Sequence, residues 1–504
     1  MIKSPAMNSL SMTPRNMSVI KAIGTLTALL SLAGCVNYSG IKGSGQILPL
    51  DQLQTSQSLP KQGGTWPAAD WYQQFGDPQL PKLIAEALAD SPSIAQARAR
   101  IAAAQAYTQG ADSKLLPTVG AQYTLNRELY SGNALYPPPY GGSWYTENNG
   151  LLNASFELDL WGKNHQGVAQ AISREKMAQA DAQQVQLTLS TSVAQTYNQL
   201  AHEYALRNLA AQITEDRRHI GTITKGRVSA GLDNQTQQRS TEGDLASSQT
   251  TLAQIDGQIT VTRYQLGALL GKGPDRGLNI AVPTLNAGDA VNLPDSLPAD
   301  LVARRPDLVS ALWQVDASLH GIKVAKAEFY PDVNLVALAG FDSFGFGRFL
   351  TAGSRQLQAG PALHIPIFDA GALRANLKGE YANFDSAVAN YNQTLVGALN
   401  DVATQVATIR AIDQQSADAQ KAYDAAQRNY ELAATRYHAG LAPEVMLLNA
   451  NLNRLNQQQV LIDLKMSRRN LQIGLIKALG GGFDATGTPL APPALASEAH
   501  AGQQ

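Results

Sequence analysis

Apolar and polar residues alternate in several short segments of this chain. In the stretch LLNASFELDLW, apolar residues at even positions alternate with polar residues at odd positions, Glu157 and Asp159 among them. This period of two is typical of a β-strand with one apolar and one polar face. It predicts four strands, at about residues 118–127, 151–161, 332–341 and 357–368.

Longer segments follow a different period. Leucine, valine and isoleucine recur at steps of four and three over residues 395–409. The same seam runs through 448–466, where Gln459 replaces one apolar residue, and through 252–266, where Thr262 does so. A stripe this narrow is typical of coiled coils. It fits the wall of a tube that is wet on both sides, and it fits a simple coiled-coil hairpin equally well.

Landmarks of the first half recur in the second half. Pro92 and Pro117 reappear as Pro306 and Pro331, at an offset of 214 residues, and the hexapeptide RVSAGL reappears 209 residues later as RYHAGL. A fixed offset is the signature of an internal repeat. We therefore expect two repeats, residues 76–290 and 291–483, with one design.

Each repeat has the same predicted order: a helix of about 30 residues, two strands, a long helix, the hexapeptide and a return helix. The first long helix, residues 165–229, would measure ~100 Å at ~1.5 Å per residue. The return helix, 235–270, covers half of that length, so the opening helix, 79–115, would fill the rest. The hexapeptides then form turns at the ends of helical hairpins, where Gly231 and Gly440 supply left-handed conformations.

The N-terminus has the layout of a secretory signal. Basic residues precede an apolar run at 22–32, which ends in the sequence LAGC with the only cysteine, Cys35. This ending resembles the bacterial lipoprotein signal, in which the cysteine receives the lipid. We expect a signal peptide at 1–34, a lipid-anchored tether at 35–75 and a disordered tail at 484–504. A secreted protein with a chance cysteine is the alternative.

Composition and motifs argue against several classes of protein. The formal net charge of −1 offers no basic field for nucleic acid. His202 and Glu203 lack a second histidine at metal-binding spacing, and GKGPDRG at 271–277 lacks the residue order of a phosphate-binding loop. We therefore expect no enzyme, no metal and no cofactor other than the covalent lipid on Cys35.

The strand count constrains the assembly. The predicted strands of each half form a hairpin around a loop, and the first loop, residues 126–150, is long, polar and rich in tyrosine. Four strands cannot enclose a water-filled lumen in a membrane, because the smallest such barrels use about eight. Unpaired edges are untenable in lipid. Membrane strands would require a barrel shared between subunits, whereas a soluble hairpin with one buried face remains the alternative.

Taken together, the landmarks resemble those of the TolC-like outer-membrane efflux proteins, in the lipoprotein branch called NodT-like. The resemblance rests on LAGC at 32–35, ELDLWGK at 157–163, ARRPDL at 303–308, GPALHIPIFDAG at 360–371 and the two hexapeptides. It implies an α+β membrane protein, a homotrimer whose 12-stranded outer-membrane barrel continues into a long periplasmic helical barrel.

The same resemblance implies a passive exit duct that exports drugs or other small toxic compounds from a Gram-negative cell. A periplasmic adaptor and an inner-membrane pump, of the resistance–nodulation–division or the fusaric-acid and aromatic-acid type, would deliver the cargo. A periplasmic scaffold lipoprotein without a channel is the alternative. The expected docking residues are Arg227, Ala230, Gly231, Leu232, Arg436, Ala439, Gly440 and Leu441.

Residues after the second hexapeptide correspond to the pore constriction of the family. Relatives carry aspartates there, whereas this chain carries Met446 and Asn449, with Glu444 as the nearest acid. Tyr437 matches a tyrosine at the family's tip. The resemblance therefore implies a more neutral, partly apolar gate, although plain packing between coils would also account for Met446.

Overall fold

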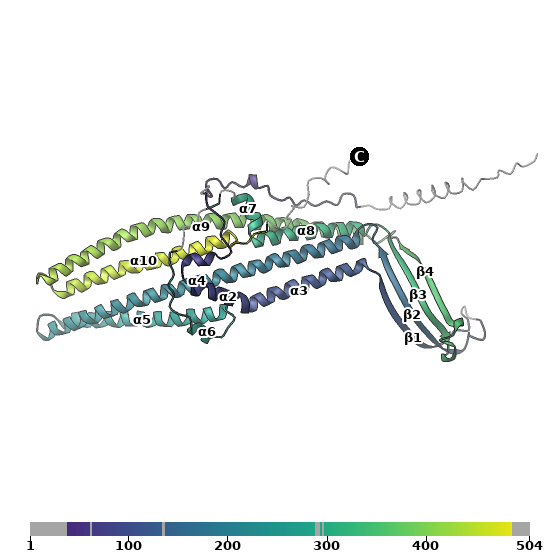
Figure 1. Cartoon of the computed structure of the whole chain (residues 1–504), viewed down its shortest axis with the longest axis horizontal. Helices are drawn as coiled ribbons and strands as arrows, with labels where there is room; N and C mark the ends of the chain where they lie inside the picture. The colour runs from purple at the N-terminus through teal and green to yellow at the C-terminus, as the bar shows by residue number, and fades with distance from the viewer. Residues whose placement is uncertain (1–37, 61–62, 134–136, 288–292, 295–296, 486–504) are drawn as a thin grey trace, which may run out of the picture. The chain divides into compact units, whose positions relative to one another are not determined.

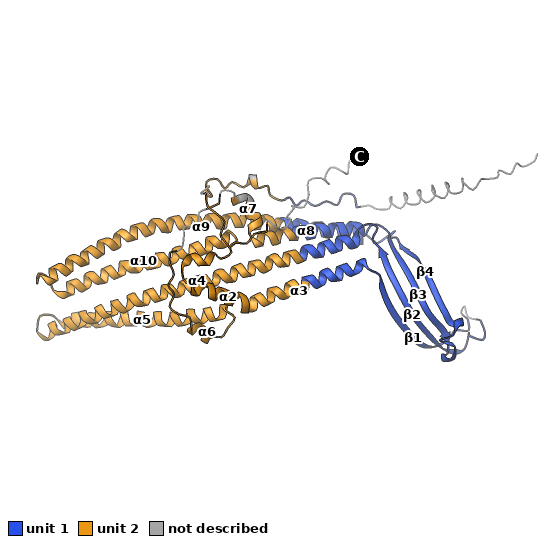
Figure 2. Cartoon of the chain, viewed as in Figure 1, with its two compact units in different colours: residues 1–46, 104–174, 314–388 blue, residues 47–103, 175–313, 389–504 orange. Residues whose placement is uncertain are grey.

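The computed structural model describes residues 38–60, 63–133, 137–287, 293–294 and 297–485. The predicted signal peptide and Cys35 lie outside these residues, as does the predicted tail beyond Ala485. Long helices and one sheet make up the chain (Figure 1). Two compact units divide it (Figure 2): unit 1 comprises residues 1–46, 104–174 and 314–388, and unit 2 comprises 47–103, 175–313 and 389–504.

Unit 1 contains a four-stranded antiparallel sheet in the order β1-β2-β3-β4. Its strands are β1 (Thr118–Leu129), β2 (Trp144–Leu158), β3 (Asp332–Phe344) and β4 (Arg355–His364). Each repeat supplies one hairpin, and β2 pairs with β3 to join the two hairpins. β1 and β4 are the edges of this sheet.

The register places apolar side chains of all four strands on one face. Val119 pairs with Ala154, Ala154 with Ala337, and Ala337 with Ala359. Because side chains alternate along each strand, this apolar face also carries Ala121, Tyr123, Leu125, Leu152, Phe156, Val333, Leu335, Ala339, Leu357 and Leu363. The polar face carries Gln122, Thr124, Asn126, Glu128, Glu147, Asn149, Asn153, Ser155, Asn334, Asp342, Gln356 and Gln358.

Several predicted strand limits were wrong. The loop expected over residues 126–150 spans only 130–143, because β1 and β2 extend into its polar ends. Backbone hydrogen bonds build a ladder whatever the polarity of the side chains, so composition alone misplaced this loop. β2 ends at Leu158 and not at 161, because Asp159 caps the next helix. β4 ends at His364, ahead of Pro366, which has no N–H to donate.

The two longest helices repeat each other. α4 (Lys163–Ser229) and α9 (Ala372–His438) each contain 67 residues, and the return helices α5 (Gln235–Leu269) and α10 (Glu444–Ala478) each contain 35. At ~1.5 Å per residue a helix of this length measures ~100 Å. The duplication found in the sequence is thus present in the lengths of the helices.

The helix expected to open each repeat is broken in both cases. α2 (Gln79–Asp90) is separated from α3 (Pro92–Asp112) at Ser91, whose ψ of 132° is extended. In the second repeat, α7 (Leu297–Arg304) and α8 (Pro306–Ala327) are separated at Arg305. Both breaks precede a proline, which disfavours helical geometry in the residue before it. α6 (Pro274–Leu278) is a short helix after α5.

The main hydrophobic core of unit 2 lies where α2 meets the middle of α4 and the end of α5. Leu83 and Ile84 of α2, Val193 and Leu200 of α4, and Leu266 of α5 are at most 1% exposed. The seam predicted in α9 is also buried, with Leu395 and Val402 fully enclosed. Heptad spacing therefore identified the packed face of these helices.

The N-terminal segment binds α9 in an extended conformation. The amides of Ser44 and Gly45 donate to the carboxylate of Asp385 over 2.8–3.0 Å, and the Ser44 hydroxyl donates to it over 2.9 Å. A Cβ on Gly43 or Gly45 would lie about 3 Å from Asp385. The segment expected to be a tether is therefore fitted closely to α9 at this point.

Candidate functional site: the two helical tips

Both hexapeptides form the turn between a long helix and its return helix, at the same end of unit 2 (Figure 1). In the first turn, the Leu232 amide donates to the Arg227 carbonyl over 2.9 Å, and the Gly231 amide donates to the Val228 carbonyl over 3.0 Å. Gly231 has a φ of +72°. This pair of bonds is the Schellman motif, which satisfies the last carbonyls of α4.

The second turn has the same backbone geometry. The Leu441 amide donates to the Arg436 carbonyl over 2.8 Å, and the Gly440 amide donates to the Tyr437 carbonyl over 2.9 Å. Gly440 has a φ of +71°. The repeated sequence thus produces a repeated structure: the arginine supplies the acceptor carbonyl, the glycine turns the chain, and the leucine follows the turn.

The side chains of the two tips are held differently. Arg227 contacts Asp233 through Nε at 3.3 Å and donates to the Leu232 carbonyl at 3.4 Å. Asn234 caps α5 by accepting from the Gln237 amide over 2.9 Å. In the second tip Pro443 occupies the N-cap position of α10 and makes no side-chain cap bond. Equivalent backbones therefore present different polar surroundings.

Each turn presents its leucine to solvent. Leu232 is 68% exposed and Leu441 is 72% exposed. Both side chains therefore project mostly into solvent in the single chain. The structure brings the eight predicted docking residues into two matching turns.

The residues predicted to form a gate do not form a single cluster. Met446 and Asn449 line a cavity of about 630 Å³ between α9 and α10, together with Arg436. Glu444 instead approaches α4, where its Oε1 lies 3.4 Å from Nε2 of His219. Tyr437 packs against His438, with ring centroids 5.5 Å apart.

Sequence reasoning missed the polar contacts that join α10 to α4 near the tips. Asn451 donates to Asp216 over 2.6 Å, and Arg454 donates to the Asn451 side chain over 3.0 Å. Burial raises the pKa of Asp216 despite the opposing effect of the Asn451 bond. Heptad spacing could not reveal these contacts, because it reports only apolar positions.

Apolar contacts accompany these polar ones. Ile220 of α4 packs against Leu448 and Leu452 of α10, with Ile213 and Ile223 beside them. This small cluster lies on the tip side of the main core. These contacts hold the helical hairpin α9–α10 against the helical hairpin α4–α5, and α2 takes no part in them.

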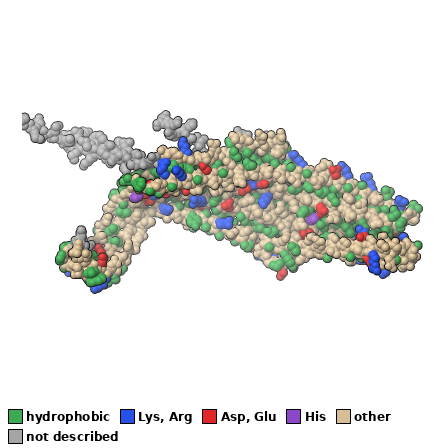
Figure 3. Space-filling view, turned by 180° about the vertical axis from the view of Figure 1, so that it is seen from behind, with side chains coloured by type: hydrophobic (Ala, Val, Ile, Leu, Met, Phe, Trp, Pro, Cys, Tyr) green, Lys and Arg blue, Asp and Glu red, His purple; other side chains and the backbone are tan. Residues whose placement is uncertain are grey.

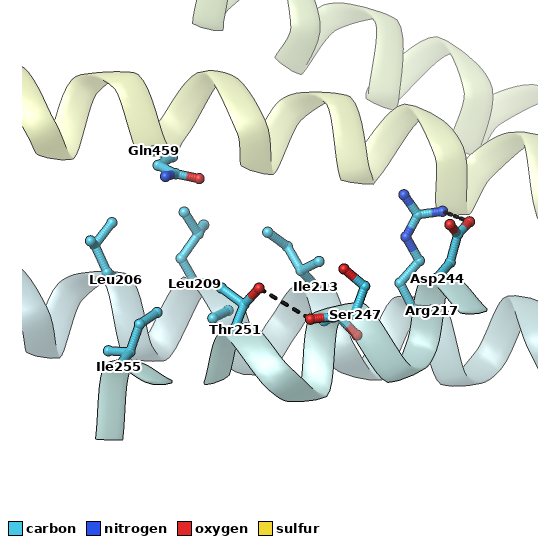
Figure 4. A pocket seen from close by; sticks show the side chains of 11 residues that line it. Leu206, Leu209, Ile213, Arg217, Asp244, Ser247, Thr251, Ile255 and Gln459 are labelled. Atoms are coloured by element: carbon cyan, nitrogen blue, oxygen red, sulfur yellow. Dashed lines mark hydrogen bonds and ion pairs between the residues drawn. The ribbon is translucent and has the colours of Figure 1, made fainter. Parts of the chain in front are cut away.

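A further cavity, of about 260 Å³, lies between α4, α5 and α10 (Figure 4). Leu206, Leu209 and Ile213 of α4 line one side, and Arg217 pairs with Asp244 of α5 at 2.9 Å. Gln459 of α10 faces these leucines (Figure 4). The one gap in the apolar seam of α10 therefore coincides with a gap in the packing.

Thr262, the polar residue in the apolar seam of α5, has a different explanation. Its hydroxyl donates to Glu203 over 2.9 Å, and Glu203 is only 4% exposed. Gln199 donates to the same carboxylate over 2.9 Å. A buried carboxylate needs donors, so the polar residue in this seam serves a buried acid.

The motif ARRPDL has a structural role in unit 2. Arg305 donates through Nε and Nη2 to the carboxylate of Asp307 over 3.0 and 2.6 Å, and through Nη1 to the Ala478 carbonyl over 3.2 Å. A Cβ on Gly480 would lie 1.8 Å from the Arg304 carbonyl oxygen. The first repeat uses the same device, because a Cβ on Gly271 would lie 2.6 Å from the Asp90 carbonyl oxygen.

The motif ELDLWGK joins β2 to α4 in unit 1. Asp159 caps α4 by accepting from the amides of Asn164 and His165 over 3.1 and 2.8 Å. Lys163 contacts Glu157 at 2.6 Å and Asp332 at 3.0 Å. Asp369 caps α9 in the second repeat, accepting from the amides of Gly371 and Leu373. The two repeats therefore begin their long helices in the same way.

Charged side chains of both signs are scattered over the helices in the view of Figure 3. No helix within the described part of the chain is both long and apolar enough to cross a membrane. The sheet carries part of the exposed apolar surface of unit 1, where Leu152 is 57% exposed, Leu357 77% and Leu363 58%.

Duplicated hairpins, matching tips and a sheet with opposed apolar and polar faces define a class of protein, and sequence comparison gives the same answer. The profile of the family described as "Outer membrane efflux protein" matches residues 83–272 and 297–481. The chain belongs to this family. It is an outer-membrane exit duct for efflux, and its localisation is the outer membrane of a Gram-negative bacterium.

Individual relatives support the same family assignment. The multidrug resistance outer membrane protein MdtP of Escherichia coli O6:H1 is 31% identical over 485 residues, covering 94% of this chain and 99% of its own length. The fusaric acid resistance protein FusA of Burkholderia cepacia is 36% identical over 363 residues, covering 71% of this chain and 68% of its own. The predicted resemblance to the outer-membrane efflux family is confirmed.

Solved structures share the fold. The outer membrane protein VceC of Vibrio cholerae has a TM-score of 0.75 and 32% identity, covering 83% of this chain and 100% of its own. The CmeC outer membrane channel of Campylobacter jejuni has a TM-score of 0.78 at 23% identity, covering 88% and 96%. The predicted α+β class and the fold of the TolC-like channels are confirmed.

Proposed function

We propose that three copies of this chain close a 12-stranded barrel in the outer membrane and conduct cargo passively. The support lies in unit 1, where β1 and β4 are the edges of a four-stranded sheet and pair with no further strand among the described residues. Lipid would face the apolar face and water the polar face. Pairing β1 of one copy with β4 of the next satisfies both edges.

The helical tips would dock a periplasmic adaptor. A single observation carries this proposal: two turns of equal geometry each present an exposed leucine, Leu232 and Leu441. Apolar side chains in rigid positions lose little entropy on binding. An adaptor could therefore engage the two tips of each chain in the same manner.

An inner-membrane pump would deliver the cargo to this duct. The names of two relatives speak of resistance to fusaric acid and of multidrug resistance. Two kinds of pump are candidate partners. One is a pump of the resistance–nodulation–division type, and the other is an exporter of aromatic acids. In either case the duct itself makes and breaks no bonds, and the cargo consists of small toxic compounds.

Lipidation of Cys35 would anchor the N-terminus. The bound segment that begins at Tyr38 supports this part of the proposal, because Tyr38 packs edge-on against Phe329, with ring centroids 5.5 Å apart. Phe329 lies three residues before β3. In the proposed organisation, residues 1–34 are a signal peptide, 35–75 an anchored tether, and 76–290 and 291–483 the two repeats.

Gating would reside near the second tip, with Met446 and Asn449 in place of an acidic ring. Both residues are exposed in the single chain and line the cavity between α9 and α10. Tyr437 and Glu444 would complete the gate from neighbouring positions. Such a constriction would be largely neutral.

The docking proposal is tested by photo-crosslinking in living cells. A photoreactive residue is placed at Leu441, at Leu232, or at Val396, which is 47% exposed on α9 away from the tips. We expect the first two positions to capture the same periplasmic adaptor, identified by mass spectrometry, and the third not to capture it. Purification through that adaptor would then identify the pump.

Two results would contradict the proposal. Capture of the adaptor at Val396 as efficiently as at Leu441 would remove the special role of the tips. Capture of only a second copy of this chain at all three positions, with normal amounts of protein in the outer membrane, would favour the scaffold without a channel.

A further inference from the structure

The polar face of the sheet changes character along its length. At the end next to α4, Glu157 and Asp332 share one cation, because both lie close to Nζ of Lys163, at 2.6 and 3.0 Å. At the opposite end, next to the loops, the face carries Glu128, Glu147 and Asp342. None of these three carboxylates forms an ion pair with any described residue. Negative charge on this face is therefore partly offset at the α4 end, and at the loop end no described cation pairs with it.

Register shows that the three carboxylates share a face. Glu147 pairs with Asn126 of β1, two residues from Glu128, and with Phe344 of β3, two residues from Asp342. Because every second side chain points to the same side, all three project from the polar face. Glu147 and Asp342 are close enough to repel each other electrostatically.

The two arginines that the strands carry at this end lie on the other face. Arg127 pairs with Thr146, and Arg355 pairs with Phe341, so both belong to the register of the apolar face. There they can reach toward anionic groups at the membrane surface. The strands thus separate their charges at this end: the arginines belong to the apolar face and the carboxylates to the polar face.

A group of aromatic rings lies beside Glu147 at this end of the sheet. Phe344 contacts Tyr130, Tyr140 and Tyr145, with ring centroids 5.4, 5.5 and 5.2 Å away. The Tyr130 hydroxyl donates to Glu147 over 3.0 Å. We refer to these four residues as the aromatic cluster. Ring faces attract cations, and quaternary ammonium groups are recognised by this combination of rings and charge.

We infer that the loop end of the sheet is a selectivity segment for cations, inorganic or organic, with Glu147, Asp342 and Glu128 as the specificity-determining residues. This inference rests on the proposed trimeric duct, in which the polar face lines the lumen. Three copies would place nine carboxylates around the exit. A ring of fixed negative charge concentrates cations and repels anions in a narrow aqueous path.

The inference also narrows the cargo. A lipophilic organic cation would meet attractive rings and carboxylates at the exit, whereas the carboxylate of an aromatic acid would meet repulsion. At the tip, Met446 and Asn449 are neutral, and Glu444, the one acid of the proposed gate, lies 3.4 Å from Nε2 of His219. In this duct, selection by charge would therefore act mainly at the outer end and not at the periplasmic end.

The test uses the purified full-length trimer in planar lipid bilayers. Reversal potentials in a potassium chloride gradient measure the permeability of potassium relative to chloride. We expect the wild type to prefer potassium, and the double variant Glu147→Gln with Asp342→Asn to lose most of this preference, several-fold. Arg355→Gln, which removes a charge at the same end from the opposite face, keeps the preference of the wild type.

A second variant separates the rings from the carboxylates. Phe344→Leu should lower the permeability of tetramethylammonium relative to potassium, while the preference for potassium over chloride remains. An unselective wild type, or a preference that survives loss of both carboxylates, overturns the inference while the duct stands. A folded trimer that never conducts overturns the proposed duct and the inference with it.

Discussion

Asp385 joins the N-terminal segment to α9, as a single carboxylate that receives donors from Ser44 and Gly45. Burial alone would raise its pKa, but the backbone bonds from Ser44 and Gly45 and the Ser44 hydroxyl outweigh this effect, so the pKa is lowered. The hydrogen bonds are therefore stronger to the ionised form. Docking of the segment and ionisation of Asp385 depend on each other.

Asp385→Ala should release the segment from α9. We expect a loss of about 1–2 kcal/mol, since hydrogen bonds to a partly exposed charge are discounted by solvent. Trypsin cleavage after the exposed Lys42 measures this release. Ser44→Ala is the matched control, because it keeps both backbone donors and should give a smaller increase in cleavage. Equal cleavage in both variants would contradict the role of Asp385.

Acid should release the segment as well. Because the bound carboxyl has the lower pKa, its stabilising effect is complete above the ordinary aspartate pKa of about 3.9 and is lost as the pH falls below it. Hydrogen exchange at Ser44 and Gly45, corrected for the intrinsic rate, should therefore accelerate below about pH 4. Asp385→Ala should show no such acceleration.

Two glycines with similar backbone angles make a further comparison at this scale. Gly440 at the tip and Gly480 after α10 have φ values of +71° and +89°. No heavy atom lies within 4 Å of a Cβ built on Gly440, whereas one built on Gly480 meets the Arg304 carbonyl. Glycine is therefore needed at position 440 only for its left-handed conformation. At position 480 it is also needed because a Cβ would have no room.

Gly440→Ala should cost about 1 kcal/mol through the left-handed conformation alone. Gly480→Ala should cost a further ~1–3 kcal/mol, because the backbone near Arg304 must move. Thermal unfolding of the two variants measures the difference. Equal losses would mean that the contact with Arg304 relaxes freely.

At the scale of the element, the seam of α10 is interrupted at one position. Gln459 stands where the heptad requires an apolar residue, and it lines the cavity between α4, α5 and α10. Leu206 and Leu209 of α4 lie across this cavity from Gln459 (Figure 4). The cavity separates the main core from the small cluster around Leu448.

Gln459→Leu should therefore stabilise unit 2 by about 1 kcal/mol, because the new side chain is partly removed from water. The unfolding temperature of the detergent-extracted protein measures this gain. Asn456→Leu is the control, since Asn456 is exposed and does not line the cavity. A gain from both substitutions would point to hydrophobicity in general and not to the cavity.

At the scale of the whole molecule, the two faces of the sheet decide where the protein can reside. Leu152 and Asn153 are neighbours near the middle of β2, and alternation sends them to opposite faces. Leu152 is 57% exposed in the single chain. Lipid would cover it in the proposed barrel, whereas Asn153 would face water.

Leu152→Lys should cost about 2–4 kcal/mol, the range for a lysine on the lipid face at the bilayer midplane. Asn153→Lys should be tolerated, since its charge remains hydrated. The yield of heat-labile trimer in outer membranes measures both. Failure of Asn153→Lys with survival of Leu152→Lys would reverse the assignment of the faces.

Much of the fold follows from sequence periodicity. Alternation located all four strands, heptads located the packed faces of α9 and α10, and the repeated hexapeptides located two equivalent turns. Each of these signals is local: the pattern reports which side of an element is buried. Prolines 92 and 306 were also visible, although the breaks they cause were missed in favour of one continuous helix.

The candidate site could be predicted only in part. Gly231 and Gly440 were identified because left-handed turns favour glycine over residues with a Cβ. The surroundings of Glu444 were not identified, since His219 lies more than 200 positions earlier and no pattern links the two. The cavity at Gln459 was visible only as a missing apolar residue.

The sequence by itself determined the elements, their duplication and the sidedness of the strands, because periodicity and chain chirality act over a few residues. Only the tertiary structure decided which distant groups meet: Asp385 with Ser44, Gly480 with Arg304, and Glu147 with Tyr130. It also separated the arginines from the carboxylates at the loop end of the sheet, through the register of the strands. Such contacts depend on the pairing of segments far apart in the chain, which local patterns do not encode.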